Sequence, residues 1–244
     1  MRWRALVQLG EDVRSFSYPR GDFGYASRVE ADLKALGVEE VAVSEEGKPL
    51  MLGKGFRNAV FLVRRGGEAL AAKVRRDDWP HDDVWREASV HGAANAVGVG
   101  PRLRGSAGRV LLMEVVEGIR LVDWLPSASG EEVVGVLGSL FRQCRALDAA
   151  GIDHGELGDP SKHVVITRGS SVVIIDFGSA RFTTRPKNVT SIAGFISKGL
   201  AREALLRAGL KPSVEPEVLR RYKRTLSEED FLAVLGSIGL ERGG

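Results

Sequence analysis

The sequence has little of several residue types, and each scarcity excludes a class of protein. Cys144 is the only cysteine among the 244 residues, which excludes an internal disulfide and any metal site built from several thiolates. No apolar run approaches the roughly 20 residues that a membrane-spanning helix needs. The first residues lack the apolar stretch of a signal peptide, so we expect a cytoplasmic protein that makes no use of a membrane.

Charge is distributed unevenly along the chain, although the net charge is only +3. Residues 161–244 carry 14 basic and 8 acidic side chains, a net charge of +6. Residues 119–160 carry 3 basic and 7 acidic side chains, a net charge of −4. The last third is therefore basic, which suits a polyanionic partner but does not require one.

Hydrophobic patterning predicts an α+β protein whose first half is rich in short strands. Apolar runs at residues 50–52, 59–63 and 69–74 are separated by glycine-containing turns, as in a meander of antiparallel strands. A helix over residues 82–96 and a strand over residues 110–116 are expected to follow.

The second half is predicted to be mostly helical. Residues 131–149 carry apolar side chains at helical spacing and predict a long amphipathic helix. A loop rich in glycine and aspartate, at residues 151–162, precedes two short strands over residues 163–167 and 172–175, which form a hairpin. Helices are expected from about residue 188 onward.

The predicted elements divide the chain into three parts. Residues 1–48, with a helix and a strand, form an N-terminal appendage whose role the sequence does not indicate. Residues 49–117 form a small β-rich lobe, and residues 118–244 form a helical lobe. The seam between the two lobes is expected near residues 114–118, after the last strand of the β-rich lobe.

Gly53 and Gly55 lie between the first two predicted strands of the β-rich lobe. Glycines at such a place let the backbone lie close over a phosphate chain, although a plain hairpin turn would also use them. A Walker loop is excluded because no glycine–lysine–serine or –threonine follows at the right spacing. A strand follows rather than a helix, which argues against a Rossmann turn.

Lys73 lies inside the apolar run 69–74, and a lysine is rarely buried among apolar residues unless its charge is paired or has a function. One explanation comes from the protein-kinase-like enzymes, in which a strand lysine binds nucleotide phosphates and pairs with a glutamate of the next helix. Glu87 lies in the predicted helix that follows. The alternative is that Lys73 extends to solvent from an edge strand.

Asp176 ends the apolar run 172–175 and is followed by phenylalanine and glycine. A carboxylate at a strand end can bind Mg²⁺ on nucleotide phosphates, although turn chemistry alone also favours aspartate there. About twenty residues earlier, His154 and Glu156 occupy the place of the kinase catalytic loop. A zinc deaminase shares His-x-Glu but needs two further cysteines, so it is excluded.

The order and spacing of these motifs resemble the protein-kinase-like superfamily over residues 50 to about 200. Residues 86–88, 99–101 and 113–118 make the chain similar to small microbial and archaeal kinases, namely the RIO kinases and the kinase subunit of the KEOPS complex. It also looks like archaeal predicted serine/threonine kinases, a group similar to RNA kinases that phosphorylate a ribose 2′-hydroxyl of tRNA. The resemblance implies a two-lobed fold with a reduced helical C-lobe and with ATP and Mg²⁺ between the lobes.

The resemblance also implies a role for each motif. Two glycines cover the phosphates, a lysine contacts them and pairs with a helix glutamate, and two hinge residues meet adenine through backbone groups. These nucleotide-binding residues are Gly53, Gly55, Lys73, Glu87, Glu114 and Val115. Asp176 is implied to bind Mg²⁺ and Glu156 to replace the catalytic aspartate, so Lys73, Glu156 and Asp176 are the implied catalytic residues.

The sequence departs from the kinase pattern at the catalytic loop. Glu156 is one methylene longer than the usual aspartate, and Asp153 and Asp159 are alternative bases. The second metal ligand, usually asparagine, falls on Ser161, Lys162 or His163 according to the alignment. Of these, His163 can ligate a metal and is taken as the candidate ligand beside Asp176. A pseudokinase that binds nucleotide without catalysis is therefore a further alternative.

The residues that follow Asp176 argue against a peptide substrate. No alanine–proline–glutamate follows Asp176 at the kinase spacing, so the platform on which protein kinases dock peptides is expected to be missing. Basic residues stand there instead, among them Arg181, Arg185, Lys187, Lys198, Arg220, Arg221, Lys223 and Arg224. We therefore expect an RNA kinase acting on a tRNA 2′-hydroxyl; the alternatives are a protein serine/threonine kinase and the pseudokinase.

Overall fold

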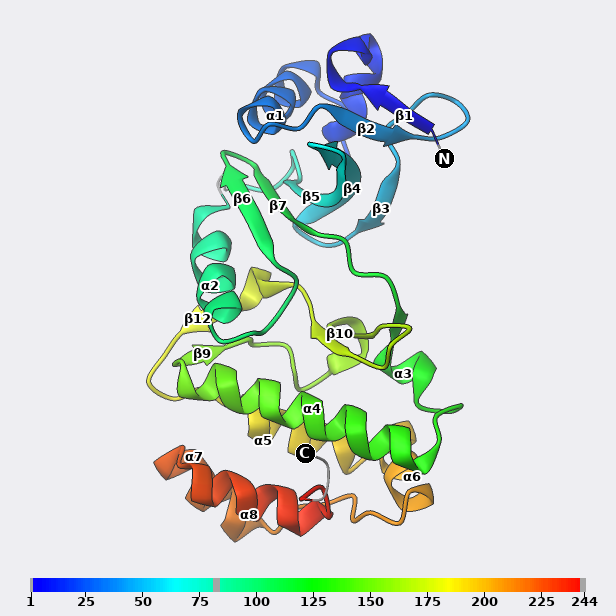
Figure 1. The fold of residues 1–244 in the computed structure, drawn as a ribbon. Helices are drawn as coiled ribbons and strands as arrows, with labels where there is room; N and C mark the ends of the chain where they lie inside the picture. Colours follow the sequence, from blue (N-terminus) through cyan, green and yellow to red (C-terminus); the bar gives the residue numbers. More distant parts are fainter. Residues whose placement is uncertain (1, 81–83, 242–244) are drawn as a thin grey trace. The chain divides into compact units, whose positions relative to one another are not determined.

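The computed structural model describes residues 2–80 and 84–241 as an α+β protein (Figure 1). The described residues group into two compact units. Unit 1 comprises the residues up to Gly92 together with Pro101–Val115. Unit 2 comprises Ala93–Gly100 and the residues from Val116 onward. One boundary thus falls between Val115 and Val116, inside the segment where the sequence places the seam.

Unit 1 is built on an antiparallel sheet that has seven strands within the described residues. The order across the sheet is β1-β2-β4-β5-β7-β6, with β3 paired to β4. The strands are β1 (Arg2–Ala5), β2 (Glu40–Val43), β3 (Met51–Lys54), β4 (Asn58–Arg65), β5 (Glu68–Arg75), β6 (Leu103–Ala107) and β7 (Val110–Glu114). The predicted runs at residues 50–52, 59–63, 69–74 and 110–116 are confirmed as β3, β4, β5 and β7.

The core of unit 1 lies between this sheet and helix α1 (Phe23–Ala35). Asp22 caps the helix by accepting a hydrogen bond from the backbone N–H of Tyr25 at 2.5 Å. Val29 and Leu33 lie one turn apart on the buried face of the helix, in one apolar cluster with Phe61 of β4. This burial supplies the main stabilisation of the sheet, since it removes large apolar side chains from water.

Residues 2–48 share the sheet and the core of the β-rich part that follows them. The sequence sets this segment apart as an appendage, whereas β1 pairs with β2 and β2 pairs with β4. Two short 3₁₀ helices, at Leu6–Gln8 and Gly10–Phe16, add apolar side chains to the same cluster. The appendage hypothesis fails here because strand pairing between distant segments leaves no local signal in sequence.

Helix α2 (Trp85–Ala96) follows β5, as expected from the predicted helix over residues 82–96. Residues 82 and 83 of that prediction lie outside the described residues. Strand β6 was not predicted, because its residues alternate weakly and include Gly105, where the register to β7 shifts.

Unit 2 is organised around the long helix α4 (Gly130–Ala149), which confirms the predicted helix over residues 131–149. Ser129 and Glu132 form a capping box at its start, which fixes where the helix begins. Its buried face carries Leu140, Phe141 and Cys144. The other helices of unit 2 are α3 (Leu121–Trp124), α5 (Asn188–Ile196), α6 (Gly199–Arg207), α7 (Pro216–Thr225) and α8 (Glu228–Ile238), with α7 and α8 side by side (Figure 1).

Short strands in unit 2 carry the loops on which the candidate site lies. The predicted hairpin is confirmed as β10 (Val164–Ile166) and β11 (Val172–Ile174), and β10 also pairs with β8 (Ile119–Arg120). A second small sheet pairs β9 (Ile152–Asp153) with β12 (Arg181–Phe182). Short 3₁₀ turns, η3 (Pro160–Lys162) and η4 (Phe177–Ser179), flank these strands. Within the described part of the chain, none of the helices is long and apolar enough to cross a membrane.

Candidate functional site

Lys73 forms a buried ion pair with Glu87 in unit 1. Its Nζ lies 2.5 Å from Oε1 of Glu87, and the two side chains are only 6% and 5% exposed. The other carboxylate oxygen of Glu87, Oε2, is buried and has no hydrogen-bond partner among the described residues. The buried ion pair therefore leaves one carboxylate oxygen desolvated and unsatisfied, which is energetically costly.

The position of Lys73 in the sheet excludes the simpler explanation for a strand lysine. Lys73 is in register with Val60 of β4 on one side and with Leu111 of β7 on the other. Lys73 therefore lies on a central strand and not on an edge strand, so it cannot reach solvent past the edge of the sheet. The carboxylate partner comes from the first turn of α2, so the pair links this helix to the middle of the sheet.

His91 lies one turn after Glu87 on the same face of α2 and is also buried. Its Nε2 is 2.7 Å from the backbone carbonyl of Pro101, which can only accept, so Nε2 carries the proton. Burial lowers the pKa of His91 below its ordinary value, and the carbonyl only partly offsets this effect. The histidine is thus neutral at pH 7 and ties α2 to the segment that enters β6.

Of the two glycines predicted to cover phosphates, Gly53 lies near the end of β3 and Gly55 lies in the turn between β3 and β4. The backbone N–H of Gly55 donates to the carbonyl of Asn58 at 2.8 Å, and Gly53 is in register with Val60. A Cβ atom added at Gly53 would meet nothing within 4 Å, and one at Gly55 would make only an ordinary contact at 3.8 Å. Packing therefore does not require glycine at either position.

Of the two predicted hinge residues, Glu114 is the last residue of β7 and Val115 follows the strand. The backbone N–H of Glu114 donates to the carbonyl of Arg102 at 2.9 Å. Its carboxylate accepts from the side chain of Arg104 at 3.1 Å and from the backbone N–H of Arg102, also at 3.1 Å. The amide of Glu114 is thus engaged within the sheet, so only its carbonyl and the backbone of Val115 remain for the adenine contact that the resemblance implies.

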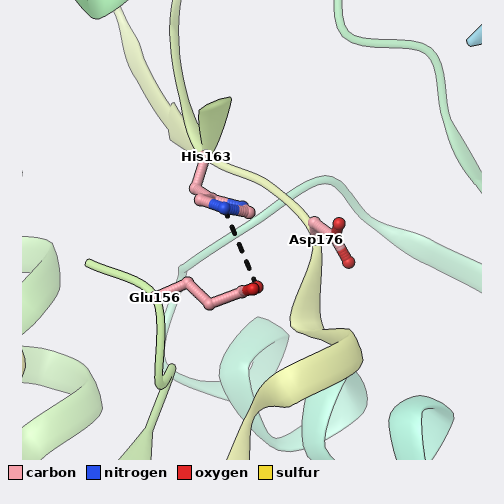
Figure 2. Close-up of side chains that lie close together, drawn as sticks. All are labelled: Glu156, His163 and Asp176. Atoms are coloured by element: carbon pink, nitrogen blue, oxygen red, sulfur yellow. Dashed lines mark ion pairs between the residues drawn. The ribbon is translucent and has the colours of Figure 1, made fainter. Parts of the chain in front are cut away.

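Glu156, His163 and Asp176 converge in unit 2, as Figure 2 shows. One potential ligand atom from each lies within 4.8 Å of those of the other two. Oε2 of Glu156 is 3.7 Å from Nε2 of His163, too far for a hydrogen bond. The His163 side chain is 13% exposed and that of Glu156 is 39% exposed. Asp176 is also exposed, so the group is open to solvent at both carboxylates.

The hairpin of β10 and β11 brings two of these side chains together. His163 immediately precedes β10, Asp176 follows β11, and the backbone N–H of Ile175 donates to the carbonyl of His163 at 2.8 Å. Asp176 has φ of 69°, a left-handed conformation that aspartate tolerates better than most residues. Its Oδ1 accepts a hydrogen bond from the backbone N–H of Gly178 at 3.2 Å.

The third side chain is held by a turn that requires glycine. Gly155 has φ of 88°, and a Cβ atom there would lie 2.9 Å from the carbonyl oxygen of Ser179. Any other residue would push the loop away from the segment that follows Asp176. Glu156, the next residue, is therefore directed toward Asp176 and His163 by the backbone rather than by its own contacts.

The two alternative bases are engaged elsewhere. Asp153 is buried and forms an ion pair with Arg181 across the pairing of β9 with β12. Asp159 accepts a hydrogen bond from the backbone N–H of Ser161 at 3.2 Å. Hydrogen bonding to the side chain of Ser161, and secondarily to its backbone, lowers the pKa of Asp159. Ser161 thus belongs to the cap of η3, whereas His163 is the alternative metal ligand that the structure brings to Asp176.

His154 packs against His163 of this group and is fully buried. Its Nε2 is 3.2 Å from the carbonyl of Ile175, and its ring centre is 5.2 Å from that of Phe177 and 5.6 Å from that of His163. Burial and, secondarily, repulsion from His163 lower the pKa of His154 from 6.5 to about 4, against the attraction of nearby Asp153 and Asp176. The ring is therefore neutral at physiological pH and supports the site through packing.

We expect the protein to lose stability as the pH falls from about 6.5 to about 4. The unfolded chain binds a proton at His154 below its ordinary pKa of 6.5, whereas the folded chain resists protonation until about pH 4. The loss is at most about 1.4 kcal/mol per pH unit for this one group, and buried His91 acts in the same direction. Urea unfolding midpoints between pH 7.5 and 4.5 would measure this loss of stability. If His154→Gln leaves the pH dependence of the midpoint unchanged, the assignment to His154 is wrong.

A buried polar network, which the sequence did not reveal, holds the loop before Glu156. Asp148 of α4 accepts four hydrogen bonds, from the backbone N–H groups of Asn188 and Val189, from Nδ2 of Asn188 and from the hydroxyl of Tyr222. Asn188 in turn donates from Nδ2 to the carbonyl of Ile152 at 2.6 Å and accepts from the backbone N–H of His154 at 2.9 Å. The network joins α4, α5 and α7 to the loop; its one sequence signal is a carboxylate on the apolar face of α4.

Removing the centre of this network should destabilise unit 2. Asp148→Ala leaves several buried donors unsatisfied, which costs about 2 to 3 kcal/mol of unfolding free energy. Tyr222→Phe removes a single donor without leaving another donor stranded and should cost about 1 kcal/mol. Urea unfolding of both variants measures the difference; equal and negligible losses would contradict the central role of Asp148.

The basic residues of the last third are partly neutralised by neighbours. On α7, Arg220 pairs with Glu217 at 2.7 Å and Arg221 pairs with Asp230 of α8. Lys223 and Arg224 on the same helix are exposed. The charge available to a polyanion from this cluster is therefore smaller than the sequence suggests.

Comparison with known proteins adds no assignment to this geometry. No protein-family model matches the sequence, and no curated protein matches it significantly.

Proposed function

We propose that the protein is an ATP-dependent phosphotransferase that transfers a phosphoryl group to a hydroxyl. The observation that carries the proposal is the buried ion pair between Lys73, on a central strand, and Glu87 of α2. A buried ion pair contributes little net stability, because desolvation of both charges offsets their attraction. Its presence is better explained by a task, and holding a lysine ready for the α- and β-phosphates of a nucleotide is the task that fits.

The glycine turn supports the same assignment. Neither Gly53 nor Gly55 is required by packing, and neither has a positive φ. A phosphate chain that lies directly over the backbone would supply the missing reason, because any side chain there would keep it away. The turn joins β3 to β4, and Lys73 lies on β5, the other strand that pairs with β4, so both lie in one sheet.

The donor set in unit 2 fits a divalent cation. Two carboxylates offer the oxygen ligands that Mg²⁺ prefers, and an imidazole nitrogen offers a third donor. Asp176 and His163 would hold the metal, which when bound neutralises charge on the nucleotide phosphates. Glu156, whose carboxylate is partly exposed, would accept a hydrogen bond from the acceptor hydroxyl and orient it for attack.

The proposal includes a finer description of the fold. Unit 1 would correspond to the small β-rich lobe of a protein-kinase-like enzyme, and unit 2 to a reduced helical lobe. The order of glycine turn, strand lysine, helix glutamate, catalytic loop and strand-end aspartate supports this description. ATP and Mg²⁺ are the cofactors that it implies.

RNA is the acceptor that we favour, with a tRNA ribose hydroxyl as the specific substrate. The net charge of residues 161–244 supports a polyanion, although two arginines of α7 are paired. Support also comes from unit 1, where Phe56 is 79% exposed and its ring centre lies 5.4 Å from that of Trp79. Arg57 lies over the half-buried Trp79 at 5.2 Å, and an exposed aromatic ring near a cation suits stacking on single-stranded bases.

Two binding measurements test the proposal. ATP with a divalent cation should raise the melting temperature of the protein, and no shift at millimolar ATP would contradict the nucleotide site. RNA affinity should fall steeply between low and physiological salt, and removal of Lys223 and Arg224 should lower it while the ATP shift persists. If ATP binds and RNA does not, a protein that accepts the phosphoryl group, as in a serine/threonine kinase, becomes the favoured alternative. If ATP binds but is neither transferred nor hydrolysed, a pseudokinase is indicated.

A further inference from the structure

The donor group of unit 2 differs from an ordinary magnesium site in one ligand. His163 offers an imidazole nitrogen in a group whose other two members are carboxylates. Mg²⁺ favours oxygen ligands and keeps much of its water, whereas first-row transition-metal ions also accept imidazole readily. The chemistry of this one side chain therefore bears on which ion the site prefers.

The spacing of the three donors suits direct coordination. Donor atoms that share an ion at about 2.1 Å lie at most about 4.2 Å apart. The three potential ligand atoms lie within 4.8 Å of one another, so small side-chain rotations close the remaining gap. Nε2 of His163 and Oε2 of Glu156, at 3.7 Å, are already within that limit.

Much of the group is held in place by the protein itself. The backbone of His163 is bonded on both sides, by donation to the carbonyl of Pro160 at 3.0 Å and by acceptance from Ile175 at 2.8 Å. Asp176 is fixed by its left-handed backbone and its bond to Gly178, and Glu156 follows a turn that only glycine can make. Such preorganisation lowers the entropy that metal binding has to overcome.

The geometry points to a transition-metal site in which Glu156, His163 and Asp176 together bind an ion such as Mn²⁺ in preference to Mg²⁺, without help from a nucleotide. Glu156 then has two tasks: one oxygen binds the metal and the other faces the acceptor hydroxyl. The inference deepens the proposed function by naming the metal and its ligands. Since the metal can be tested alone, its failure and that of the phosphotransferase proposal are distinguishable.

Titration of the full chain with Mn²⁺, followed by the electron paramagnetic resonance of the free ion, tests this inference. In the absence of nucleotide we expect one saturable site per chain, from which Mg²⁺ displaces Mn²⁺ only at much higher concentration. His163→Ala, Glu156→Gln and Asp176→Asn should each weaken binding at least about tenfold, the scale for a lost contribution at a metal site. Asp159→Asn, in the same loop but outside the donor group, is the matched control and should stay within about twofold of the unmodified chain.

His163→Asn separates ligation from a structural role. It replaces the nitrogen donor with an amide oxygen, so the preference for Mn²⁺ over Mg²⁺ should fall about tenfold while the melting temperature changes little. Co²⁺ gives a second readout, because its visible absorption reports a nitrogen ligand and should change in this variant. The inference is overturned if Mn²⁺ does not bind without nucleotide, if His163→Ala leaves its affinity intact, or if Mg²⁺ competes at equal concentration.

Discussion

Replacement of Lys73 by methionine is expected to lower the rate of phosphoryl transfer at least about a hundredfold, the scale for loss of one electrostatic contact at a transferring group. The ammonium group would neutralise charge on the nucleotide phosphates, and methionine has no charge to offer. Steady-state turnover with labelled ATP measures the effect. The nucleotide-dependent melting shift should also shrink, because the same contact would contribute to binding.

Loss of stability must be separated from loss of chemistry in this variant. Lys73→Met leaves the buried carboxylate of Glu87 without its cation, and breaking such a pair costs about 3 to 5 kcal/mol. The double variant Lys73→Met/Glu87→Leu removes both charges and should recover most of the melting temperature. Turnover should stay low in the double variant; recovery of turnover together with stability would show that the pair is only structural.

Asp176→Asn is expected to lower turnover by a similar factor, at least about a hundredfold, because it removes the carboxylate proposed to bind the metal on the phosphates. Asparagine tolerates the left-handed backbone at this position and can still accept from the N–H of Gly178. The fold should therefore be preserved, and circular dichroism with thermal unfolding checks that it is. Turnover is measured at saturating ATP over a range of metal concentrations.

The matched control for this variant is Asp159→Asn. Asp159 is exposed, lies in the same part of unit 2 and caps η3 through Ser161, which asparagine can also do. Its turnover should stay close to that of the unmodified protein. If Asp159→Asn abolishes turnover and Asp176→Asn does not, the metal and base assignments are both wrong.

The elements that could be predicted from sequence are those with a local signal. Apolar side chains at helical spacing predicted α4, and apolar runs between glycine-containing turns predicted β4, β5 and the hairpin of β10 and β11. The pairing of Lys73 with Glu87 followed from a resemblance, and the structure shows the contact directly. Spacing alone left open the alternative that Lys73 extends to solvent, so the residues without the resemblance did not predict this contact.

The rest depended on contacts between distant residues, which leave little trace in a single sequence. Pairing of β1 with β2 and of β2 with β4 draws the N-terminal segment into the sheet, although its composition suggested an appendage. Asp148, Asn188 and Tyr222 meet from three helices, so no spacing within one segment could predict their network. His163 was taken as the candidate ligand from its chemistry alone, and the pairing of β10 with β11 shows how it comes to lie near Asp176.

Transfer of the γ-phosphate is the most direct test of the central claim. Purified protein is incubated with ATP labelled at the γ-phosphate, Mn²⁺ or Mg²⁺, total tRNA from an archaeon and a protein extract as competing acceptors, with Lys73→Met and Asp176→Asn in parallel. The account predicts label in RNA with the unmodified protein and almost none with either variant. Label that enters protein bands and never RNA would contradict the RNA acceptor, and the absence of both transfer and ATP hydrolysis would contradict the phosphotransferase itself.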